Sequence, residues 1–392
     1  HWRVTVRDAR GRTATSVPAR WEMALLASAD WQAKWIAAET TVAKADREAG
    51  LLWVRGDRST DKTPRYFRLA FDLPKAGPVT LYSIANFPAT VWVDGQQIHR
   101  GPNRDTRSGS EPIAVTTHTL PAGRHVVAVA VKDPRGFNER KPHECATALM
   151  IRAEGPDGVF RLTTKGTRTT LHAPDDWKAV TFDDGAWPVA EPSKYQLQAF
   201  PGCGAFLLRR GVEVTKPIAR ARLYATALGA SEAEINGKRV GDALMTPEST
   251  DYRETLLYRA YDVTALLRPG ANAIGAMLTD GWYGSFHGLA GRFAFGPPPL
   301  RLLAQLELIY ADGSTETIAS DERWCLSEGA PVVKSEIYYG EDYDARRAQP
   351  GWSAPGFDEA GWRAAEVGGV PPCEVKANAG PPLRRVRTVP LK

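Results

Sequence analysis

The densest group of acidic residues in the sequence lies between positions 336 and 347. Glu341 and Asp344 are spaced so that a strand or loop could hold two carboxylates apart, as glycoside hydrolysis requires. Two arginines follow, the first being Arg346, and neighbouring arginines usually convert such acids into an exposed ion-paired network. We therefore predict that Glu341, Tyr343, Asp344 and Arg346 dock this segment onto a neighbouring domain through an arginine fork, and that they form no catalytic pair.

An aromatic, glycine-rich segment, Asp-Gly-Trp-Tyr, ends at Tyr283. Trp282 and Tyr283 could stack on a sugar ring, because aromatic side chains combine a large apolar face with a polar group. The alternative is that both rings fill the boundary between two domains, where aromatic residues are also enriched. The sequence favours the boundary and keeps carbohydrate contact as the second interpretation.

Other patterns that would indicate catalysis or metal binding do not occur in the sequence. The seven histidines are scattered, and there is no nucleophile elbow, phosphate-binding loop or metalloprotease helix. The four cysteines, Cys145, Cys203, Cys325 and Cys373, lack the close spacing of a zinc site. We therefore predict no catalytic residue and no metal site. Reduced thiols and disulfides both stay possible, so periplasmic, secreted and cytoplasmic locations remain open.

Composition excludes two classes of partner. The chain has 392 residues, a formal net charge of +5 and 24% charged residues, and no basic stripe concentrates the charge. We therefore expect no binding to nucleic acid. The sequence contains no apolar run of about 20 residues, so we also expect no membrane span. The length predicts several domains, each with its own core.

Alternating apolar residues separated by turn residues dominate the sequence. Asn236-Gly237 and Asp94-Gly95 each lie between two alternating runs, which is the strongest short-range signal for a β-hairpin. Segments of this kind recur along the chain without a long amphipathic helix. The pattern predicts an all-β protein built from antiparallel sandwiches.

The sequence also repeats itself. Four landmarks recur in the same order, namely 66–74 with 207–214, 91–98 with 233–240, 120–127 with 267–274, and 177–187 with 352–362. Such self-similarity indicates a tandem duplication. Because Trp187 and Trp362 end equivalent segments, we expect both to anchor a core.

These observations predict two tandem jelly-roll sandwiches, of the galactose-binding-like type, preceded by part of another domain. The predicted boundaries are 1–36 for the tail of a fibronectin- or Ig-like domain with a connector, 37–64 for a linker, 65–200 and 206–367 for the sandwiches, and 368–392 for a connector toward a missing catalytic part. Because the sequence opens directly in a strand, we expect the start of the first domain to be missing.

One series of motifs in the second repeat resembles a known family. The series comprises Tyr261-Asp-Val-Thr, 266–274, Asp280-Gly-Trp-Tyr and 337–346. It is similar to the N-terminal accessory β-domains of bacterial α-L-rhamnosidases of glycoside hydrolase family 78. The resemblance implies an inverting pair of carboxylic acids in a helical barrel further along the parent protein, so no catalytic residue maps onto this sequence.

The first repeat resembles the galactose-binding-like modules of the same enzymes, some of which bind calcium and a terminal rhamnose. Of the positions that the resemblance assigns to that site, Asn86 matches and Asp133 is a second candidate. Calcium takes six to eight oxygen ligands, and these two positions are too few to supply them. We therefore expect a structural module without a cofactor, and keep calcium-dependent sugar binding as the alternative.

The resemblance implies the N-terminal, non-catalytic portion of an α-L-rhamnosidase-like glycoside hydrolase. Its expected role is to brace the downstream catalytic domain and to contact rhamnosides or other carbohydrate, and the chain alone is expected to be inactive. Two alternatives remain, namely a stand-alone carbohydrate-binding protein and a purely structural interaction module.

Overall fold

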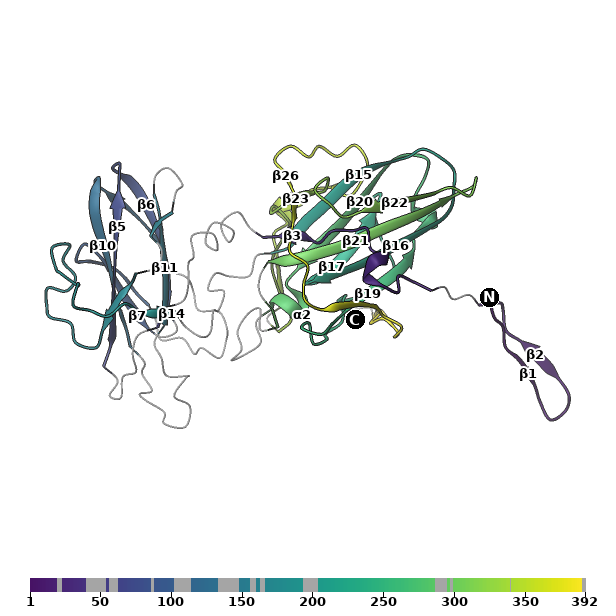
Figure 1. Cartoon of the computed structure of the whole chain (residues 1–392), viewed down its shortest axis with the longest axis horizontal. Coiled ribbons are helices and arrows are strands. Elements are labelled where there is room, and N and C mark those ends of the chain that lie inside the picture. The colour runs from purple at the N-terminus through teal and green to yellow at the C-terminus, as the bar shows by residue number, and fades with distance from the viewer. Residues whose placement is uncertain are drawn as a thin grey trace.

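The computed structural model is almost entirely β-structure (Figure 1). It describes residues 1–19, 23–39, 54–55, 63–85, 88–101, 114–132, 148–155, 160–162, 166–192, 204–285, 295–296, 299–338 and 340–389. Within these ranges no helix is long and apolar enough to cross a membrane. The all-β fold predicted from the alternating pattern is therefore confirmed.

The first sandwich is formed by two sheets with apolar inner faces. Its strands are β4 (Val54–Arg55), β5 (Arg65–Leu73), β6 (Gly77–Ala85), β7 (Ala89–Val93), β8 (Gln96–Arg100), β9 (Ala114–Leu120), β10 (Gly123–Val131), β11 (Ala148–Glu154), β12 (Phe160–Leu162), β13 (Arg168–Thr170) and β14 (Glu191–Pro192). One sheet has the order β13-β5-β10-β7-β8, and the other has the order β14-β4-β11-β6-β9 with β12 beside β11. Alternate residues of β5, from Phe67 to Leu73, are buried in the core, as a half-buried strand requires.

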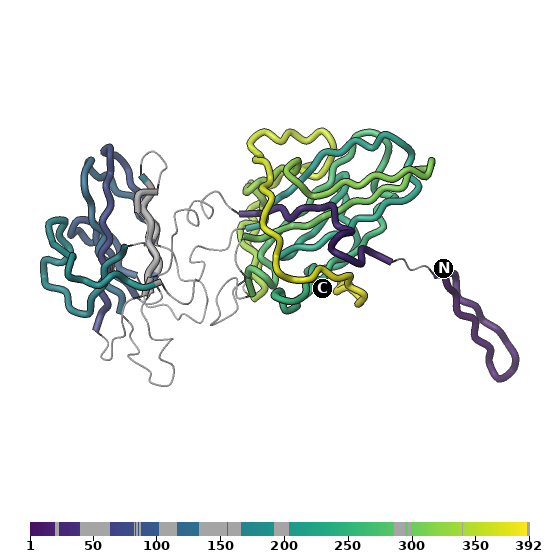
Figure 2. The backbone as a smooth tube through the Cα atoms, viewed as in Figure 1, coloured from purple at the N-terminus to yellow at the C-terminus, as the bar shows by residue number. Residues whose placement is uncertain are grey.

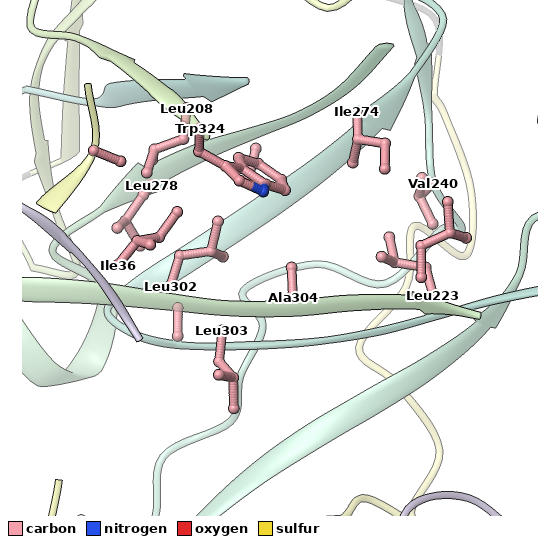
Figure 3. Close-up of a cluster of buried hydrophobic side chains, with 14 of the residues drawn as sticks. Ile36, Leu208, Leu223, Val240, Ile274, Leu278, Leu302, Leu303, Ala304 and Trp324 are labelled. Atoms are coloured by element: carbon pink, nitrogen blue, oxygen red, sulfur yellow. The ribbon is translucent and has the colours of Figure 1, made fainter. Parts of the chain in front are cut away.

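The second sandwich has the same architecture with longer strands. Its strands are β3 (Ile36–Ala38), β15 (Phe206–Val214), β16 (Ile218–Leu228), β17 (Ala230–Ile235), β18 (Lys238–Arg239), β19 (Thr255–Asp262), β20 (Gly270–Thr279), β21 (Leu300–Tyr310), β22 (Thr315–Ala319), β23 (Cys325–Ser327), β26 (Arg363–Ala364), β27 (Glu366–Val367) and β28 (Glu374–Ala377). One sheet has the order β18-β17-β20-β15-β23-β26, and the other has the order β27-β3-β21-β16-β19-β28 with β22 beside β21. Ile36, Leu278 and Leu302 meet in its core (Figure 3).

Short elements complete the described structure. They are the hairpin strands β1 (Thr5–Arg7) and β2 (Thr13–Thr15), the hairpin strands β24 (Val332–Glu336) and β25 (Gly340–Tyr343), the 3₁₀ turns η1 (Ser28–Asp30), η3 (Thr264–Leu266) and η5 (Ala345–Arg347), and the single-turn helix α2 (Gly281–Gly284). The two hairpin turns predicted from sequence are also present. Asp94 and Asn236 have φ angles of 49° and 53°, and the glycine after each is also at positive φ, as a type I′ turn requires.

The strand order of the two sandwiches supports the duplication. In the first sandwich β4 lies between β14 and β11, and in the second β3 lies between β27 and β21. The register also corresponds, because Arg68 faces Ala128 across β5 and β10 while Arg209 faces Gly275 across β15 and β20. Each copy therefore uses a short strand that precedes its first long one.

This pairing differs from the predicted boundaries in three places. β3 crosses the expected 36/37 boundary and belongs to the second sandwich, where Ile36 pairs with Leu302 and is fully buried. β4 lies in the expected linker but pairs with β11 of the first sandwich, and β28 lies in the expected C-terminal connector but pairs in parallel with β19. The first sandwich is consequently inserted between β3 and β15 of the second.

Residues 25–35 are fixed on the second sandwich (Figure 2). The Trp31 ring packs edge-on against Tyr258, with 5.2 Å between ring centroids. The Gln305 side-chain oxygen accepts hydrogen bonds from the backbone N–H groups of Gln32 and Ala33, at 2.6 and 3.2 Å. This part of the predicted connector is therefore an integral part of the second sandwich.

Candidate functional site

The aromatic segment that was expected at a domain boundary, or alternatively at a sugar, forms the helical turn α2. Gly281 has a φ of 52°, and a Cβ atom there would lie 2.5 Å from the backbone nitrogen of Ala230. Only glycine fits both the conformation and this close approach. The contact fixes α2 against the start of β17 and decides which way the two following aromatic side chains point.

Tyr283 points into the protein. Its side chain is 2% exposed and packs edge-on against Tyr252 at 5.4 Å between centroids. Burial raises the pKa of Tyr283 to about 12, even though a hydrogen bond with Arg301 favours the ionised form. This position leaves Tyr283 little exposed surface for the sugar contact that was the second interpretation. The reason is that a single helical turn turns adjacent residues to different sides, so one ring is buried when its neighbour is not.

Trp282 lies at the surface next to a residue that sequence reasoning missed. Its ring is half-buried and meets Tyr338 edge-on, with centroids 6.4 Å apart and an interplanar angle of 85°. Tyr338 is 65% exposed. The available signal was its place beside the acidic cluster, in the same run that carries the family resemblance.

We call β24, β25 and the connecting residues 337 and 338 the arm. β24 and β25 pair antiparallel, with Lys334 opposite Asp342 and Ser335 opposite Glu341. At the base, Val332 is buried with Leu207 in a small apolar cluster. Near the tip, the Ile337 backbone N–H donates to the hydroxyl of Ser285, just after α2, at 3.2 Å. The arm therefore brings together the two groups of residues that the sequence singled out separately.

The predicted arginine fork is local. Arg346 Nε and Nη2 each lie 2.8 Å from a different oxygen of Asp344, and the Arg346 backbone N–H also donates to that carboxylate at 3.1 Å. The Arg346 side-chain hydrogen bond holds the pKa of Asp344 below its usual value. Arg346 remains 90% exposed. The pair closes the turn η5 within its own loop, and contact with another domain stays a prediction.

Glu341 and Asp342, the two acids of β25, do not converge as a glycosidase pair would. Glu341 and Asp342 are adjacent on β25, so their side chains point to opposite faces of the strand. Both are exposed. A cavity described in the second sandwich is lined by Thr226, Arg259 and Tyr261, among others, and has no carboxylate among its lining residues. An acid pair facing one pocket is the arrangement that glycoside hydrolysis needs.

The calcium alternative falls largely outside the described residues, since Asn86 and Asp133 are not among them. In the part of the chain that the structure describes, no group of three or more His, Cys, Asp or Glu side chains is placed to hold a metal ion. Asp94 serves a different purpose there, because it binds His125 at 2.6 Å and the Val126 backbone N–H at 2.9 Å. Cys325 and Cys373 are free thiols, and Cys145 and Cys203 lie outside the described ranges.

Comparison with known proteins gives consistent matches. Residues 216–387 match the family model of the α-L-rhamnosidase N-terminal domain. An α-L-rhamnosidase of Streptomyces avermitilis is 34% identical over 415 residues, which cover 100% of this chain and 39% of that protein. One from Formosa agariphila is 37% identical over 160 residues, covering 41% of this chain and 17% of that protein.

A solved structure gives the same result. The crystal structure of the Streptomyces avermitilis α-L-rhamnosidase complexed with L-rhamnose superimposes with a TM-score of 0.64 at 30% identity. The match covers 98% of this chain and 39% of that chain. This chain therefore spans about two fifths of the length of the relative that it matches throughout.

Proposed function

We propose that this chain is the non-catalytic N-terminal portion of an α-L-rhamnosidase-like glycoside hydrolase. Its residues 216–387 match the family model of the α-L-rhamnosidase N-terminal domain. The observation that carries this proposal is a match over the whole chain to only 39% of a longer α-L-rhamnosidase. In such a protein the catalytic acids would lie in the part that this chain does not match. The role of the chain would then be to brace that part.

The placement of the acidic residues supports a bracing role. A catalytic pair must converge on a substrate pocket, whereas Glu341 and Asp342 diverge on an exposed strand and Asp344 is occupied by Arg346. The parent protein would hydrolyse terminal α-L-rhamnose from glycosides, as the resemblance implies. This chain would supply a rigid surface instead of reacting groups.

Contact with carbohydrate is the finer part of the proposal. Trp282 and Tyr338 present aromatic surface at one edge of the second sandwich. Such a surface can stack on a sugar ring that enters from a neighbouring catalytic pocket. Tyr283 is replaced in this role by Tyr338. Sugar binding through Asn86, which lies outside the described residues, stays the alternative for the first repeat.

Hydrolysis of an aryl α-L-rhamnoside tests the main proposal. The isolated chain is expected to give no turnover, while the complete parent protein is expected to release the aryl alcohol. Turnover by the isolated chain would overturn the assignment of roles. An inactive parent protein would overturn the α-L-rhamnosidase proposal itself.

Two measurements test the finer part, namely the KM of variants of the parent enzyme and a titration of the isolated chain with L-rhamnose. Trp282→Ala and Tyr338→Ala are expected to raise KM of the parent enzyme for a polymeric rhamnoside by about tenfold, because loss of a stacked ring weakens sugar binding. The matched control is Trp2→Ala, because Trp2 is an exposed tryptophan near the β1–β2 hairpin. Trp324 is unsuitable as a control because it lies in the core. Saturable rhamnose binding by a chain that has no catalytic partner would favour the alternative of a stand-alone carbohydrate-binding protein.

A further inference from the structure

The arm is a two-stranded sheet that projects from the second sandwich. Two strands alone are marginally stable in water, and a third strand or a packed face is normally needed. The outer side of β24 is partly covered, because the Ala205 backbone N–H donates to the Val332 carbonyl at 2.8 Å. β25 pairs only with β24 among the described strands, and all four of its residues are exposed. Its outer edge is therefore open.

The side chains of β25 are polar and aromatic in a particular combination. Glu341 and Asp342 are exposed carboxylates, and neither forms an ion pair with another described residue. Tyr343 is 60% exposed, and Tyr338 at the tip is similarly accessible. Exposed acids beside exposed aromatic rings form a surface that suits a cationic partner, since carboxylates and ring faces both attract guanidinium groups.

Arg346 does not cancel this charge. Its guanidinium is held by both oxygens of Asp344, so this fork is neutral as a pair. The whole chain carries a net charge of +5. The arm is thus an acidic feature on a basic protein, and this contrast is more specific than the general exposure of a loop.

We propose that the arm is the surface on which the catalytic portion of the same protein docks, through arginine or lysine side chains that pair with Glu341 and Asp342 and cover Tyr338 and Tyr343. The inference rests on the proposed function, because it takes its partner from the longer α-L-rhamnosidases. A protein surface fits better than a sugar, because a protein can supply the cationic side chains that pair with Glu341 and Asp342, whereas a neutral sugar cannot. The charged pairs would set the orientation of docking.

Backbone amide exchange in residues 340–343 provides a direct test. In the isolated chain the amides of this segment that point away from β24 are expected to exchange rapidly, because that edge is open to water. In the complete parent protein their exchange is expected to slow by at least about tenfold. Only a modest docking free energy is needed for this, because the docked state then has to be about ten times more populated than the undocked state. Equal exchange in the two samples would overturn the proposal.

A charge-reversal variant of the complete parent protein gives the second test. Glu341→Lys combined with Asp342→Lys is expected to remove the added protection and to shorten the half-life of rhamnosidase activity at elevated temperature by about fivefold or more, because like charges then face each other. Glu213→Lys combined with Glu254→Lys makes the same charge change at exposed acids outside the arm and is expected to match the wild type. If the parent hydrolyses the rhamnoside and the arm variant behaves as the control does, the arm proposal fails while the proposed function stands. A parent without activity would remove the basis of both.

Discussion

The two sandwiches retain the same ionic contact at the same place. On the outer face of each first sheet, a buried arginine binds a carboxylate from the tail that closes the domain. Arg68 Nε lies 2.9 Å from Asp184, and Arg209 pairs with Glu359. Each guanidinium also lies over a phenylalanine ring, at 5.1 Å in the first copy and 5.3 Å in the second. This shared contact fixes the tail of each copy to its sheet.

The tryptophans beside this contact pack differently in the two copies. In the first, Trp177 lies on Ala128 and stacks with Trp187 at 6.2 Å, so the tail closes on itself. In the second, Trp352 lies directly over Gly275 and packs toward Val332 at the base of the arm. The duplication thus kept the charged contact and changed the apolar one. The tail of the second copy supports the arm, which has no described counterpart in the first.

Removing the shared contact should have the largest effect. Arg68→Met and Arg209→Met each leave a partly buried carboxylate without its partner, which typically costs about 3 to 5 kcal/mol. We expect each variant to lower the unfolding free energy of its own sandwich alone, measured by urea unfolding followed by calorimetry of the separate transitions. Arg253→Met, at an exposed arginine of the second sandwich, is the control. A loss below about 1 kcal/mol in one copy would show that the contact stabilises only the other sandwich.

The strand β3 gives a test of the insertion. Ile36 is fully buried in the core of the second sandwich although it lies before the first in sequence. Ile36→Ala is expected to cost the second sandwich about 3 kcal/mol through lost burial and a cavity, and to leave the first unchanged. Val6→Ala, at an exposed position of the first hairpin, should change neither. Destabilisation of the first sandwich instead would contradict the inserted arrangement.

Exchanging the residues under the tail tryptophans should have a smaller effect. A Cβ atom at Gly275 would lie 2.5 Å from the Trp352 ring, so Gly275→Ala should cost the second sandwich about 2 kcal/mol through overpacking. The reverse change, Ala128→Gly, should cost the first about 1 kcal/mol. Gly211→Ala is the matched control, because no atom lies within 4 Å of the added Cβ atom. If Gly275→Ala proves neutral in thermal unfolding, the close seat of Trp352 is incorrect.

The sequence predicted those parts of the fold that depend on local chemistry. Alternation marked the long strands, and Asp94 and Asn236 marked two tight turns because each precedes a glycine that accepts positive φ. The repeated landmarks identified the duplication. β3 was missed because three residues are too few to show a period of two, and its partner Leu302 lies far along the chain.

The candidate site was predicted only in part, for a similar reason. Trp282 and Tyr283 are neighbours in sequence, and only the position of α2 against Ala230 decides which ring is buried. The fork of Arg346 was expected, but its carboxylate was not assigned to Asp344. Contacts between distant segments, such as Ile337 with Ser285, have no signal in a single sequence.

The turn networks of the two copies show the finest difference. In the first, His125 lies between Asp94, at 2.6 Å, and the Pro121 carbonyl, at 2.9 Å. Each of the two ring nitrogens of His125 therefore faces an oxygen atom. In the second, Asn236 donates to Asn272 at 2.8 Å, and Asn272 in turn bonds the backbone of its own turn. A histidine–carboxylate contact in one copy thus stands where the other has two amides.

Grafting one network onto the other should reveal whether they are interchangeable. Asp94→Asn and His125→Asn are each expected to destabilise the first sandwich, and the double variant should recover about 1 kcal/mol relative to the sum, since the two residues contact each other. The measurement is a double-mutant cycle in urea.

The opposite graft, Asn236→Asp with Asn272→His, should recover nothing. The Asn272 side chain donates to the Arg268 and Gly270 carbonyls and accepts the Arg268 backbone N–H, and an imidazole cannot replace all of these bonds while also meeting residue 236. Equal recovery in both directions would mean that the two turns are equivalent. Unequal recovery would mean that each turn has become fitted to its own residue pair since the copies diverged.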